Sequence, residues 1–213
     1  MKKLNIIYED KEILVINKPS GLLTVSTPKE KERTLFHEAS DYVKKSNPKI
    51  KIFIINRLDK DTSGIVMFAK KQSVKYDYQN NWDNLVVKRG YYAVVHGILD
   101  NKDGTIKSYL KETKTLMVYS SSKKDGKLAI TKYKVLKENN RHSLIDIEIK
   151  TGRKNQIRVH MKDINHPIVG DKKYGTKDKS KRMMLHAYEL QIKNPKTKKI
   201  QTFTCNIPKE FDI

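Results

Sequence analysis

The sequence predicts an α+β fold: a mainly antiparallel, mixed sheet with helices packed against it. Ten segments have the character of strands, and several of them, such as Ala129–Leu136 and Leu144–Ile149, alternate apolar and polar residues. Such alternation is typical of antiparallel strands with one solvated face. Only three stretches have helical character. Because many connections look like hairpins, a doubly wound parallel sheet is disfavoured.

The 213-residue chain is long enough for one substantial domain, or for two small ones that share a core. It has no internal repeat and no linker rich in Pro, Gly or Ser, so we expect a single domain over residues 1–213. The expected strands are Asn5–Tyr8, Ile13–Asn17, Ile52–Ile55, Gly64–Ala69, Tyr91–Val95, Leu116–Ser120, Ala129–Leu136, Ser143–Ile149, Met184–Lys193 and Ile200–Cys205. The expected helices are Leu35–Lys45, Val74–Trp82 and Asn155–Ile164, the last with Asn155 as its N-cap and with Ile157 and Met161 on its buried face.

The charge balance favours a nucleic-acid partner. Lys and Arg number 45 against 24 Asp and Glu, which gives a formal net charge of +21. Such an excess favours polyanions through phosphate neutralisation, and it predicts an affinity that falls with added salt. The alternative is a lysine-rich surface that is simply well solvated.

Several classes of protein are disfavoured by what the sequence lacks. One cysteine, Cys205, excludes an internal disulfide framework, and the six histidines do not have the spacing of metal ligands. No glycine-rich phosphate-binding motif is present, so we expect neither a metal nor a nucleotide cofactor. No apolar run approaches the roughly 20 residues of a membrane helix, and the N-terminus becomes charged too early for a signal peptide. We therefore expect a soluble, cytoplasmic protein.

The segment NRLDKDTSGIVMFAK (Asn56–Lys70) places several charges between two apolar runs, Ile52–Ile55 and Ile65–Phe68. A carboxylate held there, such as Asp59, can serve as a nucleophile or base if it stays ionised. A nearby guanidinium favours the ionised form. Taken alone, these residues are more typical of a charged surface turn than of a catalytic site.

Other segments make the pattern more specific. They are EDKEILVINKPSGLL (Glu9–Leu23), VKRGYYAVVHG (Val87–Gly97), TGRKNQIRVHM (Thr151–Met161), HPIVGDKKYG (His166–Gly175) and LHA (Leu185–Ala187). Together with Asn56–Lys70, they resemble, in the same order, the motifs of RluA-type pseudouridine synthases. The RsuA type is the nearest rival within the superfamily, but IVMFAK is more similar to the RluA type. The resemblance spans almost the whole chain.

The resemblance implies a pseudouridine synthase fold and the isomerisation of uridine to pseudouridine in RNA, without a cofactor. By position in the motifs, the family's catalytic aspartate corresponds to Asp59 and its active-site tyrosine to Tyr91. The arginine that pairs with the catalytic carboxylate corresponds to Arg158. Arg57 is implied to hold the target nucleotide outside the RNA stack. Further RNA contacts are expected from Arg153, Lys154, Asn155, Lys172 and Lys173.

Three positions depart from the family pattern: Asn56 stands where histidine is usual, and Lys154 and Asn155 stand where Thr or Ser followed by His is common. These departures affect expected RNA contacts rather than bond-making. The family-like opening begins within the first ten residues, so we expect the catalytic domain alone, without an additional N-terminal RNA-binding domain. The expected partner is ribosomal RNA, transfer RNA or both, bound by a monomer. The alternative is a non-catalytic RNA-binding protein, an assembly factor or RNA chaperone, that retains the fold.

Overall fold

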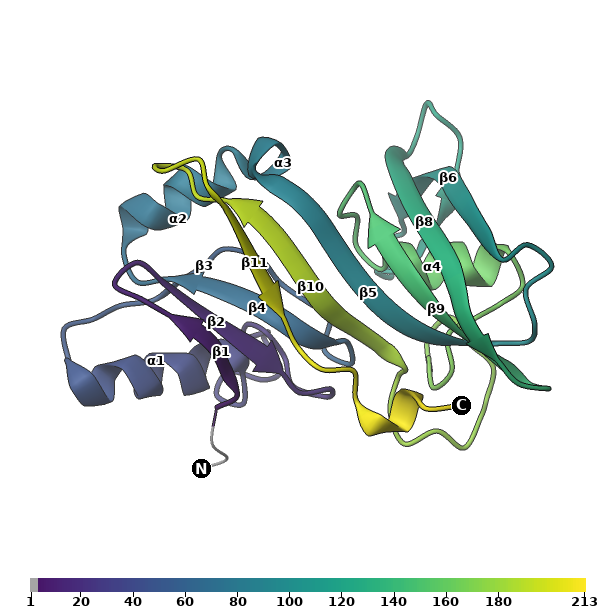
Figure 1. The fold of residues 1–213 in the computed structure, drawn as a ribbon, viewed down its shortest axis with the longest axis horizontal. Coiled ribbons are helices and arrows are strands. Elements are labelled where there is room, and N and C mark those ends of the chain that lie inside the picture. Colours follow the sequence, from purple (N-terminus) through teal and green to yellow (C-terminus); the bar gives the residue numbers. More distant parts are fainter. Residues whose placement is uncertain (1–3) are drawn as a thin grey trace. The chain divides into compact units, whose positions relative to one another are not determined.

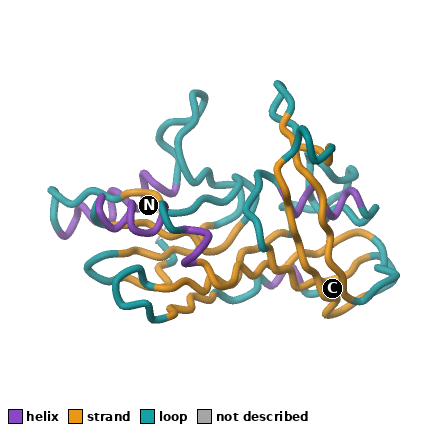
Figure 2. Tube along the Cα trace, turned by 90° about the horizontal axis from the view of Figure 1, so that it is seen from above, coloured by secondary structure: helices purple, strands orange, loops and turns teal. Residues whose placement is uncertain are grey.

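The structure, a computed structural model, describes residues 4–213, which contain eleven strands, four α-helices and one short 3₁₀-helix (Figure 1). The chain forms two compact units. Unit 1 runs to Val87 and includes Ala187–Asn206, whereas unit 2 comprises Lys88–His186 and Ile207–Ile213. Strands and loops make up most of the chain, and helices are short (Figure 2). The predicted α+β class is confirmed.

Unit 1 is built on the strand order β1-β2-β4-β10, with β11 paired to β10 and β3 paired to β4. Strand β2 pairs antiparallel with both β1 and β4. The elements are β1 (Ile6–Glu9), β2 (Ile13–Lys18), α1 (Leu35–Ser46), β3 (Phe53–Ile54), β4 (Ser63–Ala69), α2 (Gln72–Gln79), α3 (Trp82–Leu85), β10 (Leu185–Lys193, mostly in unit 1) and β11 (Ile200–Thr204).

Apolar side chains cover both faces of the central strands in unit 1, which explains why β2 and β4 read as nearly continuous apolar runs. Successive residues of β4 face opposite sides. Met67 belongs to the cluster that contains Val74 and Tyr78 of α2. Phe68 belongs to the cluster that contains Leu35 and Val43 of α1. Charged side chains are therefore confined to the ends of these strands.

Unit 2 has the strand order β5-β9-β8-β6-β7, and every neighbouring pair in it is antiparallel. Its helix α4 packs on one face, where Ile157 and Met161 join a core cluster with Ile145 and Ile147 of β9. The elements are β5 (Val86–His96, mostly in unit 2), β6 (Asp103–Glu112), β7 (Val118–Ser121), β8 (Lys127–Glu138), β9 (His142–Ile149), α4 (Gln156–Asp163) and a 3₁₀-helix (Lys209–Phe211).

All ten expected strands and all three expected helices are present, with boundaries that differ by a few residues. The sequence analysis missed β6 and the short helix α3. Strand β6 has few apolar residues and only one buried one, Leu110. Its strand conformation depends on pairing with β8 and β7 rather than on an apolar pattern of its own, so local patterning did not reveal it.

The prediction that Asn155 acts as the N-cap of α4 is correct in position but wrong for the side chain. Asn155 does occupy the position before the helix, but its side chain makes no capping hydrogen bond. Its backbone is left-handed, with φ of 53°, whereas an N-cap residue normally has an extended backbone. The side chain is buried instead and bonds to Tyr174 and Arg158.

We expect Tyr78→Phe to leave the fold intact and to raise the free energy of unfolding. Among the described residues, the hydroxyl of Tyr78 has no hydrogen-bond partner, and burial raises its pKa to about 12. Removing an unsatisfied buried hydroxyl relieves a desolvation cost of about 1 kcal/mol. Urea unfolding measures the change, with the exposed Tyr76→Phe as control. A clear loss of stability in Tyr78→Phe would show that the hydroxyl is satisfied.

Candidate active site

Asp59 lies in unit 1, in the loop between β3 and β4. Its side chain is half-buried, whereas Arg57 and Asp61 on the same loop are exposed. Asp59 thus has exposed charged residues on both sides of it along the loop. The exposed side chain of Arg57 can reach a ligand in solvent.

Side-chain hydrogen bonds hold the loop on the side that precedes Asp59. The Oδ1 atom of Asn56 accepts from the backbone N–H of Met67 at 2.8 Å, which ties the loop to β4. The hydroxyl of Thr24 donates to the carbonyl of Leu58 at 2.8 Å. Asn56, one of the three departures from the family pattern, therefore has a local structural role in this chain.

A buried lysine holds the loop on the other side of Asp59. Lys18 is fully buried, and its ammonium donates to the carbonyls of Pro19, Leu22 and Lys60 at 3.0, 2.7 and 2.9 Å. The N–H of Gly21 donates to the same Lys60 carbonyl at 3.0 Å. Because a buried cation requires several acceptors in place of water, Lys18 joins the Pro19–Leu22 turn to the loop that carries Asp59.

Gly64 is the second residue of β4, directly after this loop. Its φ of 117° lies in a region that side chains rarely adopt, and a Cβ would lie 2.1 Å from the backbone oxygen of Ala187. Only glycine fits there. Thr62 and Ser63 beside it are 3% exposed each, so this Thr-Ser-Gly segment is buried where the loop meets β4.

Tyr91 lies on β5 in unit 2, opposite Ile147 of β9. It packs against the core cluster that contains Ile157 of α4. The next residue, Tyr92, packs against a different cluster with Val94 and Phe211. The two tyrosines therefore face opposite sides of the sheet, and Tyr91 is the one on the face that α4 covers.

Arg158 projects from α4 and forms a buried, bidentate ion pair with Asp171. The Nε and Nη2 atoms donate to the two carboxylate oxygens, both at 2.7 Å. Burial acts to raise the pKa of Asp171, but hydrogen bonds and charge from Arg158, together with the N–H groups of Tyr174 and Lys173, lower it on balance. Asp171 is thus held ionised beside the guanidinium.

The turn before α4 is anchored by Gln156. Its Oε1 accepts from the hydroxyl of Thr151 at 2.7 Å and from the N–H of Arg153 at 3.1 Å. Its Nε2 donates to the hydroxyl of Thr131 on β8 at 2.9 Å. These bonds fix where α4 begins, and therefore where Arg158 projects.

The other expected RNA-contacting residues of unit 2 differ in exposure. Arg153 and Lys154 are exposed; the first donates to the carbonyl of Leu128 at 2.9 Å, and the second pairs with Glu112. Lys172 and Lys173 are exposed on the following loop. Asn155 is only 8% exposed, so its surroundings are protein side chains. Its RNA contact stays a prediction.

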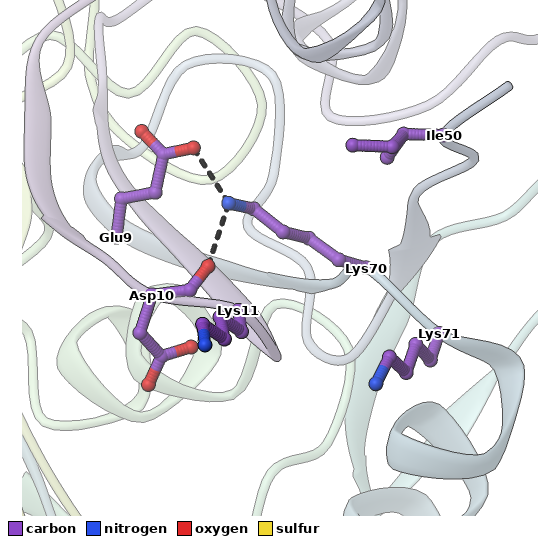
Figure 3. Close-up of a pocket in the computed structure, with 6 residues that line it drawn as sticks. All are labelled: Glu9, Asp10, Lys11, Ile50, Lys70 and Lys71. Atoms are coloured by element: carbon purple, nitrogen blue, oxygen red, sulfur yellow. Dashed lines mark hydrogen bonds and ion pairs between the residues drawn. The ribbon is translucent and has the colours of Figure 1, made fainter. Parts of the chain in front are cut away.

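A hollow of about 580 Å³ in unit 1 is lined by Glu9, Asp10, Lys11, Ile50, Lys70 and Lys71 (Figure 3). The ammonium of Lys70 bonds at 2.6 Å both to Glu9 and to the carbonyl of Asp10. Burial opposes ionisation of Glu9, but hydrogen bonds from Lys70 and Tyr42 lower its pKa on balance. The central charges are therefore satisfied within the protein, as in a structural ion pair.

Within residues 4–213, no group of three or more His, Cys, Asp or Glu side chains is arranged to hold a metal ion. Over the same residues, no helix has the length and apolar character needed to cross a bilayer. Cys205 directly follows β11 and is half-buried, and this burial raises its pKa to about 12.

A family model described as RNA pseudouridylate synthase matches residues 12–163, which include Asp59, Tyr91 and Arg158. The chain belongs to this family. The resemblance to the RluA type is thereby confirmed, and the chain is an isomerase of the RNA pseudouridine synthase class that acts on uridine in RNA.

The synthase also has similar curated relatives. An uncharacterised RNA pseudouridine synthase of Mycoplasma pneumoniae is 36% identical over 214 residues, which cover 98% of this chain and 68% of the relative. The ribosomal large subunit pseudouridine synthase D of Borreliella burgdorferi is 36% identical over 217 residues, covering 98% of this chain and 66% of the relative. Both similarities extend well beyond the individual motifs.

Solved structures support the fold of the synthase. Human RNA pseudouridylate synthase domain containing 1 has a TM-score of 0.80 at 23% identity, over 96% of this chain and 84% of that one. The human domain containing 4 protein has a TM-score of 0.79 at 21% identity, over 97% and 90% of the respective chains.

Sequence reasoning missed three buried residues that organise the segments of this synthase. The sequence analysis predicted no individual role for Lys18, Asp171 or Gln156. Their only signal was a charged or amide side chain inside a segment that resembles a family motif. Sequence does not distinguish a buried charge from an exposed one, because the difference depends on the rest of the fold.

The stability of the synthase should fall as the pH drops from about 6.5 to about 4, because of His160. This residue is fully buried between Ser108 and Thr131, and burial lowers its pKa from 6.5 to about 4, partly offset by Asp163. In this window the unfolded chain binds a proton that the folded chain does not, which removes about 1.4 kcal/mol per pH unit.

Urea unfolding of wild type and His160→Gln at several pH values measures this dependence. We expect the variant to be less stable at pH 7 and to lose less free energy of unfolding per pH unit below pH 6.5. Parallel pH profiles for the two proteins would show that His160 is not the group that titrates.

Proposed function

We propose that the synthase isomerises uridine at one or a few sites in ribosomal RNA, transfer RNA or both, with Asp59 as nucleophile or base and without a cofactor. In this reaction the N1–C1′ bond breaks, the uracil turns, and a C5–C1′ bond forms. The proton lost from C5 is balanced by the one gained at N1. No electrons are exchanged and no group enters or leaves, so the chemistry requires no external reagent.

The observation that carries this proposal is the rigid attachment of the Asp59 loop. A catalytic carboxylate must be held close to the reacting geometry. Thr24 holds the backbone just before Asp59, and Lys18 holds it just after. Asp59 itself stays partly exposed between them, as a group that meets an external substrate must be.

Tyr91 and Arg158 complete the proposed chemistry. Tyr91 would offer an aromatic face to the extruded uracil and a hydroxyl near the C5 proton. Arg158 would donate charge-assisted hydrogen bonds that keep Asp59 ionised. Fixation of Arg158 by Asp171 supports this role, because a guanidinium with a defined orientation is a more selective donor than a mobile one.

RNA binding would depend on exposed cations. Extruding a uridine costs about a few kcal/mol of stacking, and phosphate contacts from a protein of net charge +21 help to offset it. Arg57 beside Asp59, and Lys172 and Lys173 in unit 2, are exposed and suited to such contacts. Arg153 and Lys154 are suited as well, although both also bind protein groups.

We expect Asp59→Asn to abolish isomerisation and to leave RNA affinity nearly unchanged, because the amide keeps the shape of the side chain and loses its nucleophilic charge. Unmodified transfer and ribosomal RNA would be incubated with each protein, and pseudouridines mapped by carbodiimide-dependent reverse-transcription stops. The matched control is Asp61→Asn, which changes an exposed carboxylate on the same loop.

New stops with wild type and Asp61→Asn, and none with Asp59→Asn, would support the mechanism and name the target uridine. Pseudouridine formation by Asp59→Asn would contradict it. Tight, salt-sensitive binding with no new stops for any protein would favour a non-catalytic RNA-binding role.

We expect Arg158→Ala to reduce the isomerisation rate by about 100-fold and Lys172→Ala to reduce mainly RNA affinity. The first change removes donors proposed to act on the catalytic carboxylate. The second removes one phosphate contact and should lower the salt slope of binding by about 1. Single-turnover rates and RNA titrations at several salt concentrations separate the two effects.

Removing Arg158 also leaves Asp171 buried without its partner, which costs about 3–5 kcal/mol. Thermal unfolding of each variant must therefore show that it is folded at the assay temperature. An equal effect of both substitutions on the single-turnover rate would contradict the assigned roles.

A further inference from the structure

The guanidinium of Arg158 is fixed along one edge by Asp171. Its Nε and Nη2 atoms each lie 2.7 Å from a carboxylate oxygen. The carboxylate is itself immobilised, because its Oδ1 also accepts from the N–H groups of Lys173 at 2.9 Å and Tyr174 at 3.0 Å. With four donors on two oxygens, Asp171 cannot rotate without breaking several bonds at once.

Tyr174 fixes the same guanidinium through its face. The Cζ atom of Arg158 lies 5.0 Å from the centre of the Tyr174 ring, within the range of a cation–π contact. The ring is 5% exposed, and its hydroxyl accepts from the backbone N–H of Val118 at 2.8 Å. The ring is therefore attached at both ends, through its own backbone N–H to Asp171 and through its hydroxyl to Val118 at β7.

Asn155 links these two groups. Its Oδ1 accepts from Nη1 of Arg158 at 3.3 Å, and its Nδ2 donates to the hydroxyl of Tyr174 at 3.0 Å. Since a guanidinium can only donate, the amide can take only this orientation. The left-handed backbone of Asn155, with φ of 53°, is what turns the side chain inward instead of toward the helix end.

Asp171, Tyr174 and Asn155, which we term the guanidinium cradle, thus contact one edge, one face and the remaining nitrogen of a single planar group. All three are less than 9% exposed. We propose that the cradle residues are positioning residues for uridine isomerisation, which hold Arg158 in the one orientation that the reaction uses. This inference rests on the proposed function of Arg158.

A purely structural role for the cradle would also explain its burial. The two roles differ in their dependence on Arg158. A positioning residue acts on the reaction only through the guanidinium, so its removal should not matter once the guanidinium is gone. A structural residue would affect the fold, and hence the reaction, whichever side chain stands at position 158.

The test uses Asp171→Asn, Tyr174→Phe and Asn155→Gly in the full chain. Asparagine keeps the shape of Asp171 and removes its charge. Glycine tolerates the left-handed backbone at position 155, so Asn155→Gly removes the amide without backbone strain. Each change is also made together with Arg158→Lys, which keeps the positive charge but cannot form the bidentate pair. Tyr119→Phe is the control, because Tyr119 is 43% exposed on β7.

Single-turnover isomerisation rates, RNA dissociation constants and melting temperatures are measured for every variant. In the background that retains Arg158, we expect Asp171→Asn and Asn155→Gly to slow isomerisation by about 10- to 100-fold, and Asp171→Asn to leave RNA affinity unchanged. Tyr174→Phe should have a smaller effect because its ring remains. In the Arg158→Lys background these further losses should disappear, and Tyr119→Phe should match its parent protein in each background.

The positioning role is overturned if folded cradle variants isomerise at the wild-type rate. It is equally overturned if the losses are the same in both backgrounds, which is the result of a structural role. If Asp171→Asn proves to be destabilised, the comparison of Asn155→Gly in the two backgrounds decides between these outcomes. Absence of turnover by wild type on every RNA would instead overturn the proposed function, and the positioning role with it.

Discussion

A buried cation must exchange its hydration shell for protein acceptors, and this constraint organises the segment that carries Asp59. Lys18 has no access to solvent, and three backbone carbonyls from two loops surround its ammonium. The cost of an unsatisfied buried charge is so large that these carbonyls cannot move apart independently. The Pro19–Leu22 turn and the Asp59 loop consequently behave as one rigid piece of unit 1.

Unit 2 also contains a buried cation that needs protein acceptors in place of water, the guanidinium of Arg158. Three backbone carbonyls accept from the ammonium of Lys18. Arg158 is buried against the carboxylate of Asp171, so that pair is close to neutral. A neutralised guanidinium contributes little long-range field. What it retains is a set of directional N–H donors, whose usefulness depends on orientation. This explains why so many contacts are devoted to fixing one side chain.

Several of the charged side chains that hold the segments of the proposed site are buried, whereas several cations proposed to bind RNA are exposed. Lys18, Asp171 and Arg158 are buried and held by several bonds each, whereas Arg57 and Lys172 reach solvent. Mobile surface cations suit phosphate groups, which tolerate variation in geometry. Bond-making steps tolerate little variation. The side chains that must keep a fixed orientation therefore lie in the interior of each unit, and the cations proposed to bind phosphate lie on its surface.

The family resemblance found in the sequence identified the reaction class and the segments of the proposed site, and the apolar runs predicted β2 and β4 because both faces of those strands are covered. The sequence did not reveal β6, whose strand conformation depends on pairing with β7 and β8 rather than on its own apolar pattern. Nor did it reveal that Asn155 turns inward, or that the partner of Arg158 in unit 2 is Asp171. Burial and pairing of a polar side chain depend on contacts between segments distant along the chain, and only the tertiary structure decides which polar residues come together.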